Sequence, residues 1–134
     1  MRKAGFVFGA MVAAVVALGS SAADEKVPPI KTIMKTIAGS KKEKGLCAKC
    51  VEAGKGEKWE DAQKLSKDLA NCVANLPKNA CPKGDEKNWE KLAKAFAEQA
   101  KVIQKAADDK DAKAFTEATA AFTKACGACH KEHK

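Results

Sequence analysis

The amino-acid sequence predicts an all-α fold, an antiparallel four-helix bundle. The alternation of apolar and polar residues that strands require is absent, and β-branched residues are scarce. Four segments instead repeat apolar residues at steps of three and four, the period of an amphipathic helix. Most connections between these segments are short, so successive helices are expected to lie side by side in opposite directions.

The first helical segment follows the proline pair Pro28–Pro29, and proline suits the first turn of a helix. Its apolar residues are Ile30, Ile33, Met34 and Ile37. The polar stretch Gly39–Gly45 interrupts the pattern, and a helical stretch from Leu46 to Val51 can resume the same helix.

The second segment ends where two prolines and a glycine predict a loop, from Leu76 to Asp85. Asp85 suits the N-cap of the third segment, and the stretch ADDKD separates the third segment from the fourth. Bulky side chains are few and alanines are many, which leaves room in the core for a cofactor. The apolar positions of the three segments are Trp59, Ala62, Leu65, Leu69, Cys72, Val73 and Leu76; Trp89, Leu92, Phe96, Ala100, Ile103 and Ala107; and Phe115, Ala118, Phe122, Ala125, Cys126 and Cys129.

Residues 1–23 have the pattern of a cleaved signal peptide. A basic start at Arg2–Lys3 precedes an apolar stretch, and small residues suit cleavage near Ala23. A retained membrane anchor is the alternative, because the uncharged stretch approaches the roughly 20 residues that a spanning helix needs. Export predicts a periplasmic protein with one domain, residues 24–134.

The formal net charge is +8 at pH 7, and beyond residues 1–23 every cation is a lysine. Nucleic-acid recognition relies on arginine and on aromatic side chains, so this composition argues against it. The charge serves either solubility or the steering of the protein toward an acidic partner.

The strongest motif is CGACH, Cys126–His130. On a helix its two thiols and its imidazole project from one face, and the pentapeptide is the attachment motif of c-type haem. Three alternatives are a disulfide beside an unrelated histidine, a redox-active CxxC pair, and a zinc site. A redox-active CxxC pair usually lies at the start of a helix, whereas this motif is expected at the end of one. A zinc site would need further ligands, and His133 is the only other histidine in the sequence.

From Asn88 to Lys134, NWEKLAKAFAEQAKVIQKAADDKDAKAFTEATAAFTKACGACHKEHK, the chain resembles the class II cytochromes c, the cytochrome c′ family. The segment IKTIMKTI also resembles the first helix of that family. The family motif continues with an aromatic residue and then arginine or lysine. Here His133 replaces the aromatic residue, and Lys134 keeps the cation.

The resemblance implies one covalently bound haem c per chain. It assigns Cys126 and Cys129 as thioether ligands and His130 as the proximal iron ligand, with the first helix over the opposite haem face. Met34 stands where family members carry either a methionine ligand or a residue that blocks the sixth position, so Met34 is the expected distal ligand. A core methionine without a ligand role and a lysine amine as the sixth ligand are the alternatives.

Two further side chains, Ile33 and Phe122, are expected to bind the cofactor beside Met34. His133 lies one turn past His130 on the same helix, so it cannot reach the opposite face of the same haem. We therefore expect His133 to be exposed.

Four more cysteines lie outside the motif. CAKC, Cys47–Cys50, lacks a following histidine, so a second haem is not expected. Disulfides between Cys72 and Cys81 and between Cys47 and Cys50 fit an oxidising compartment. Cross-pairing among these four residues and a zinc site of four cysteines remain open.

The expected function is a periplasmic monohaem electron carrier that meets a redox partner with an acidic surface. The alternatives are a five-coordinate haem protein that binds nitric oxide or carbon monoxide, and a haem-free, disulfide-stapled helical module that binds a partner. Neither a Ser/His/Asp set nor a glycine-rich phosphate loop is present, so an enzyme is not expected. Stable membrane insertion is not expected, and the resemblance leaves a homodimer open.

Overall fold

The computed structural model describes residues 26–134, and this part of the chain is all-helical. The predicted all-α class is confirmed. The predicted signal peptide, residues 1–23, lies outside the described residues. Five α-helices and one 3₁₀ turn follow in order: α1 Ile30–Ala38, α2 Leu46–Lys55, α3 Trp59–Val73, η1 Leu76–Lys78, α4 Glu86–Asp108 and α5 Ala112–His133.

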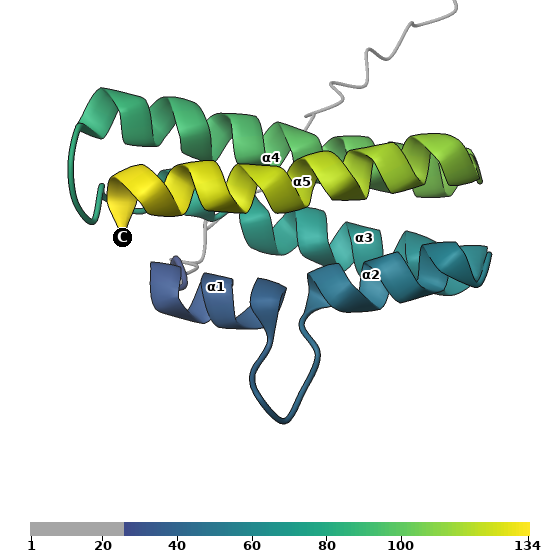
Figure 1. Ribbon diagram of the computed structural model, residues 1–134. Coiled ribbons are helices and arrows are strands. Elements are labelled where there is room, and N and C mark those ends of the chain that lie inside the picture. The colour runs from purple at the N-terminus through teal and green to yellow at the C-terminus, as the bar shows by residue number, and fades with distance from the viewer. Residues whose placement is uncertain (1–25) are drawn as a thin grey trace, which may run out of the picture.

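The two long helices, α4 and α5, lie side by side and run in opposite directions (Figure 1). Helix α3 packs against α4, and α2 contacts both α3 and α5. Helix α1 contacts α2 and α3 and lies at the end of the molecule where α5 ends (Figure 1). This arrangement brings the beginning of the described chain next to its end.

The stretch Gly39–Gly45 divides the first expected helical segment into two helices. Gly39 has a positive φ of 83°, and an isolated backbone bridge joins it to Lys44. A Cβ atom on Gly39 or Gly45 would collide with the backbone of the other glycine, so this narrow loop requires both. Helix α2 therefore starts anew at Leu46 and does not continue α1.

An aspartate caps the N-terminus of each of the two long helices. Asp85 accepts a hydrogen bond from the backbone N–H of Asn88 over 3.0 Å, which confirms the predicted N-cap of α4. Asp111 caps α5 in the same way, through the N–H of Ala114. Helix α3 ends at Val73, earlier than expected, and Leu76 is buried from the 3₁₀ turn that follows.

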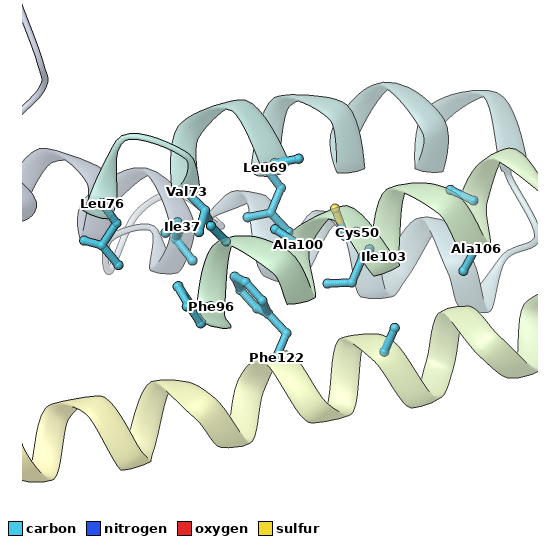
Figure 2. Packing of buried hydrophobic residues seen from close by; sticks show 14 of the residues in the cluster. Ile37, Cys50, Leu69, Val73, Leu76, Phe96, Ala100, Ile103, Ala106 and Phe122 are labelled. Carbon is cyan, nitrogen blue, oxygen red and sulfur yellow. The ribbon is translucent and has the colours of Figure 1, made fainter. Parts of the chain in front are cut away.

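The core is built from a few large side chains and many alanines. Phe96 and Phe122 stack between α4 and α5 with ring centroids 4.1 Å apart (Figure 2). Trp59 meets Phe115 edge to face at 6.0 Å. The largest fully buried side chains are Phe115, Phe122, Ile33, Leu69, Leu76, Ile103 and Val73.

Two helical glycines provide a matched test of this packing. In α2, a Cβ atom on Gly54 would collide with the ring of Phe115, whereas a Cβ atom on Gly127 in α5 meets nothing within 4 Å. We expect Gly54→Ala to lower the free energy of unfolding by about 1–2 kcal/mol, because overpacking outweighs the gain in helix propensity. Gly127→Ala should raise it by up to about 1 kcal/mol. Urea unfolding followed by circular dichroism measures both, and equal stabilisation by the two variants would contradict the tight contact with Phe115.

Candidate functional site

A mostly apolar cavity of about 780 Å³ opens where α1 meets the last turns of α5. The loop before α4 and the first turn of α4 complete its wall with Pro82 and Trp89. A smaller recess of about 10 Å³ shares some of these side chains and extends toward the core. Its lining residues are Met34, Leu76, Phe96, Cys126, Cys129 and His130.

The motif at the end of α5 presents its three functional side chains together. The helix continues through His133, so Cys126, Cys129 and His130 lie on one face at positions i, i+3 and i+4. Both thiols are half-buried, and His130 is exposed. The Cys126 thiol donates a weak hydrogen bond to the carbonyl of Phe122 over 3.5 Å. The imidazole of His130 has no hydrogen-bond partner among residues 26–134.

Met34 reaches this site from α1. The side chain is half-buried and lines both the large cavity and the recess, where it joins Cys126, Cys129 and His130. Ile33 and Phe122, the other two residues expected at the cofactor, are 1% and 0% exposed and belong to the core. Neither lines the two cavities. Four of the six side chains expected at the site thus come together around one recess.

The expectation that His133 is exposed was wrong. Its side chain is only 6% exposed and packs edge to face on Trp89 with ring centroids 5.5 Å apart. The carbonyl of Lys83 can only accept, so Nδ1 donates to it over 2.6 Å. Nε2 is then left to accept from the Asn88 side chain at 3.4 Å. His133 and Trp89 together form the wall that closes this end of the cavity.

Sequence reasoning missed this wall, although a signal for it was present. The short break between α4 and α5 makes the two helices antiparallel neighbours. Trp89 and His133 lie at about the same distance from that break along the chain, so they face each other. An apolar ring at the start of α4 therefore required a partner near the end of α5.

All six cysteines are free thiols in this structure, and no two sulfur atoms lie at disulfide distance. Neither the Cys72–Cys81 nor the Cys47–Cys50 disulfide is therefore formed in it. The Cys81 thiol instead donates to the carbonyl of Lys83 over 3.2 Å and lies 3.7 Å from Nδ1 of His133. Burial raises the pKa of the Cys72 thiol on α3.

The two motif thiols have cysteine neighbours on other elements. Burial raises the pKa of Cys126, and the nearby Cys47 raises it further. Burial likewise raises the pKa of Cys129, with a smaller contribution from Cys81. Cys47 on α2 and Cys81 on the loop before α4 therefore lie close to the two ends of the motif.

The charged residues that line the large cavity are all lysines. Lys31 and Lys35 come from α1, and Lys83 comes from the loop before α4. The ammonium group of Lys83 also donates to the backbone oxygen of Lys134, which lines the cavity too, over 3.4 Å. The rim of the cavity is therefore basic and can attract carboxylates.

Comparison of the chain with protein families, with curated proteins and with solved structures finds no match. No helix within residues 26–134 is long and apolar enough to cross a membrane. The same residues contain no cluster of three or more histidine, cysteine, aspartate or glutamate side chains that could hold a metal ion. A zinc site of four cysteines therefore has no geometric support in this part of the chain.

Proposed function

We propose that this protein is a periplasmic monohaem cytochrome c of class II that carries electrons. One observation supports this function above all others. Cys126, Cys129 and His130 share a face of α5 and line, together with Met34, a single apolar recess. Two thiols for the vinyl groups and an imidazole for the iron are what attachment of haem c requires.

The surroundings of these residues fit a haem. The cavity volume of about 780 Å³ lies in the range of small-molecule and cofactor sites. Ile30 and Trp89 supply apolar walls, and Lys31 and Lys35 supply cations suited to the two carboxylates of the porphyrin. The absence of a cluster of three metal-ligating side chains is compatible with this site, since a haem iron takes four of its ligands from the porphyrin.

We also propose that the fold is an antiparallel four-helix bundle of the cytochrome c′ type. In this description α1 and α2 count as one interrupted helix, followed by α3, α4 and α5. Two observations support it: α1 and α2 both contact α3, and α2 also packs against α5. Residues 24–134 form this domain, and residues 1–23 act as the cleaved signal peptide.

When bound, a haem would supply a one-electron iron couple. Cys126 and Cys129 would hold the porphyrin through thioether bonds, and His130 would bind its iron. Met34 approaches from α1, and a thioether ligand favours reduced iron and raises the potential. The lysines around the cavity steer an acidic redox partner toward this end of the molecule. No residue is assigned a catalytic role.

One observation favours a second function, the binding of nitric oxide or carbon monoxide at five-coordinate iron. Met34 lines the large cavity as well as the recess, so open space adjoins the Met34 side chain. A small gas could occupy that space if the Met34 sulfur were not bound to iron.

The visible spectrum of the oxidised, exported protein tests these functions. We expect covalently bound haem and a low-spin spectrum. Met34→Leu removes the sulfur, keeps the apolar bulk and should convert the spectrum to high-spin, whereas Ile30→Leu, on the same helix and cavity wall, should leave it unchanged. An unchanged spectrum in Met34→Leu would remove Met34 as a ligand. A colourless protein from a host that attaches haem would leave the haem-free module as the remaining function.

A further inference from the structure

A second CxxC pair faces the haem-attachment motif. CAKC, Cys47–Cys50, occupies the first turns of α2 with the same spacing as the cysteines of CGACH. The Cys47 sulfur lies 3.9 Å from the hydroxyl of Thr123 on α5. Thr123 and Cys126 are three residues apart, so they are neighbours on α5. The contact between α2 and α5 thus brings one dithiol pair toward the other.

The two cysteines of CAKC differ in accessibility. Cys47 is half-buried at the α5 interface, whereas Cys50 is fully buried in the core (Figure 2). In a thiol–disulfide exchange Cys47 can therefore be the attacking thiol. Cys50, one helical turn away, can then form a disulfide with Cys47. Cys50 packs within the hydrophobic core, so its sulfur is shielded from external oxidants and reductants.

The proposed haem attachment requires that Cys126 and Cys129 are still reduced thiols when the haem arrives. Oxidising compartments convert neighbouring thiols into disulfides. Cys126 and Cys129 are neighbours on one helical face and can be closed into a ring. A sulfur in a disulfide carries no S–H to add to a vinyl group, so the ring blocks attachment.

We propose that Cys47 and Cys50 form an internal dithiol that reduces a Cys126–Cys129 disulfide. The thiolate of Cys47 attacks the sulfur of Cys126, which forms a Cys47–Cys126 bond and releases Cys129 as a thiolate. The thiolate of Cys50 then attacks Cys47 and releases Cys126. The two protons given up by Cys47 and Cys50 pass to Cys129 and Cys126. One disulfide and two thiols are present before and after the exchange, so no external reductant is consumed.

The direction of the exchange follows from the burial of Cys50. Burial, together with Cys47 and Asp68, raises the pKa of Cys50 to about 12. A thiolate of high pKa is a poor leaving group, so a disulfide that contains Cys50 resists reopening. Cys126 and Cys129 are only half-buried, whereas Cys50 is fully buried, so the exchange runs toward Cys47–Cys50 and leaves the motif thiols reduced. This role rests on the proposed haem attachment, whereas the exchange itself does not require haem.

Tryptic mapping of the haem-free full chain tests the exchange, because lysines separate the relevant cysteines. Trypsin yields GLCAK with Cys47, CVEAGK with Cys50, and ACGACHK with both motif cysteines. The chain is oxidised with glutathione disulfide to the level of one disulfide, and its free thiols are then alkylated. We expect the GLCAK–CVEAGK link to exceed the closed ACGACHK ring at least about tenfold.

Cys50→Ser removes the resolving thiol and should trap the mixed disulfide, seen as GLCAK linked to ACGACHK. Cys47→Ser should abolish that link, and the control Cys72→Ser on α3 should leave the wild-type pattern unchanged. A closed ACGACHK ring that dominates in the wild type, with no trapped link in Cys50→Ser, would overturn the proposal. If the wild type shows the expected links but never acquires haem in a competent host, the haem function fails and the exchange stands.

Discussion

A chain in which Cys126 and Cys129 are both replaced by serine is expected to carry no covalently bound haem. The two thiols share one face of α5 and line the recess with His130, so they are the sulfurs placed to form thioethers there. Serine keeps the size and the helix but provides no sulfur for the vinyl groups. The measurement is the intact mass after export from a host that attaches haem, combined with a haem stain of the denatured protein.

The control for this variant is Cys72→Ser. Cys72 is half-buried on α3 and lines neither cavity, so the exchange of its sulfur for oxygen should leave the haem in place. If the Cys126→Ser/Cys129→Ser chain retained haem after denaturation, the haem would have to be attached through other cysteines. CAKC is the other CxxC pair and would then be the next candidate, and the assignment of Cys126 and Cys129 as the thioether ligands would be wrong.

Phe122→Ala is expected to cause the largest loss of stability, about 3–5 kcal/mol in the free energy of unfolding. Phe122 is 0% exposed, and its ring stacks on Phe96 with centroids 4.1 Å apart and an interplanar angle of 17°. The alanine-rich surroundings cannot collapse into the space that the ring leaves. For a domain of this size the melting temperature should fall by on the order of 10–20 °C.

Val102→Ala provides the control for Phe122→Ala. Val102 is 56% exposed on α4, and its truncation should change the free energy of unfolding by less than about 0.5 kcal/mol. Both variants are compared with the unaltered chain by urea unfolding of the exported protein. A loss below about 1 kcal/mol for Phe122→Ala would mean that Phe122 is not a central core residue. Unchanged spectra in the native Phe122→Ala protein would assign it to the core and not to the haem wall.

The helical period was enough to predict the class of the fold and most of its helices. Asp85 could be recognised as a cap because its chemistry is local. Helix ends were less predictable, since Leu76 is buried whether the chain around it is α-helical or 3₁₀. The separation of α1 from α2 depends on two glycine backbones that meet across the loop, and periodicity does not report such a contact.

The residues of the candidate site also differ in how well the sequence alone predicts their positions. Cys126, Cys129 and His130 could be placed together because their spacing lies within one helix. Met34 required the resemblance to a known family, since its approach to α5 is a tertiary contact. The burial of His133 was missed because the expectation rested on its position one turn past His130, and that position does not report tertiary contacts. The ring of Trp89 and the carbonyl of Lys83 hold His133 in the interior.

The modest anchoring of α1 has a consequence for access to the cavity that Met34 lines. This helix spans nine residues, and only Ile33 and Ile37 of it are buried. No side chain caps its N-terminus, and helices this short are marginal without tertiary support. Local unfolding of α1 would therefore cost far less than global unfolding. Such unfolding would remove Met34 from the cavity wall and open the site to a ligand while α4 and α5 stay paired.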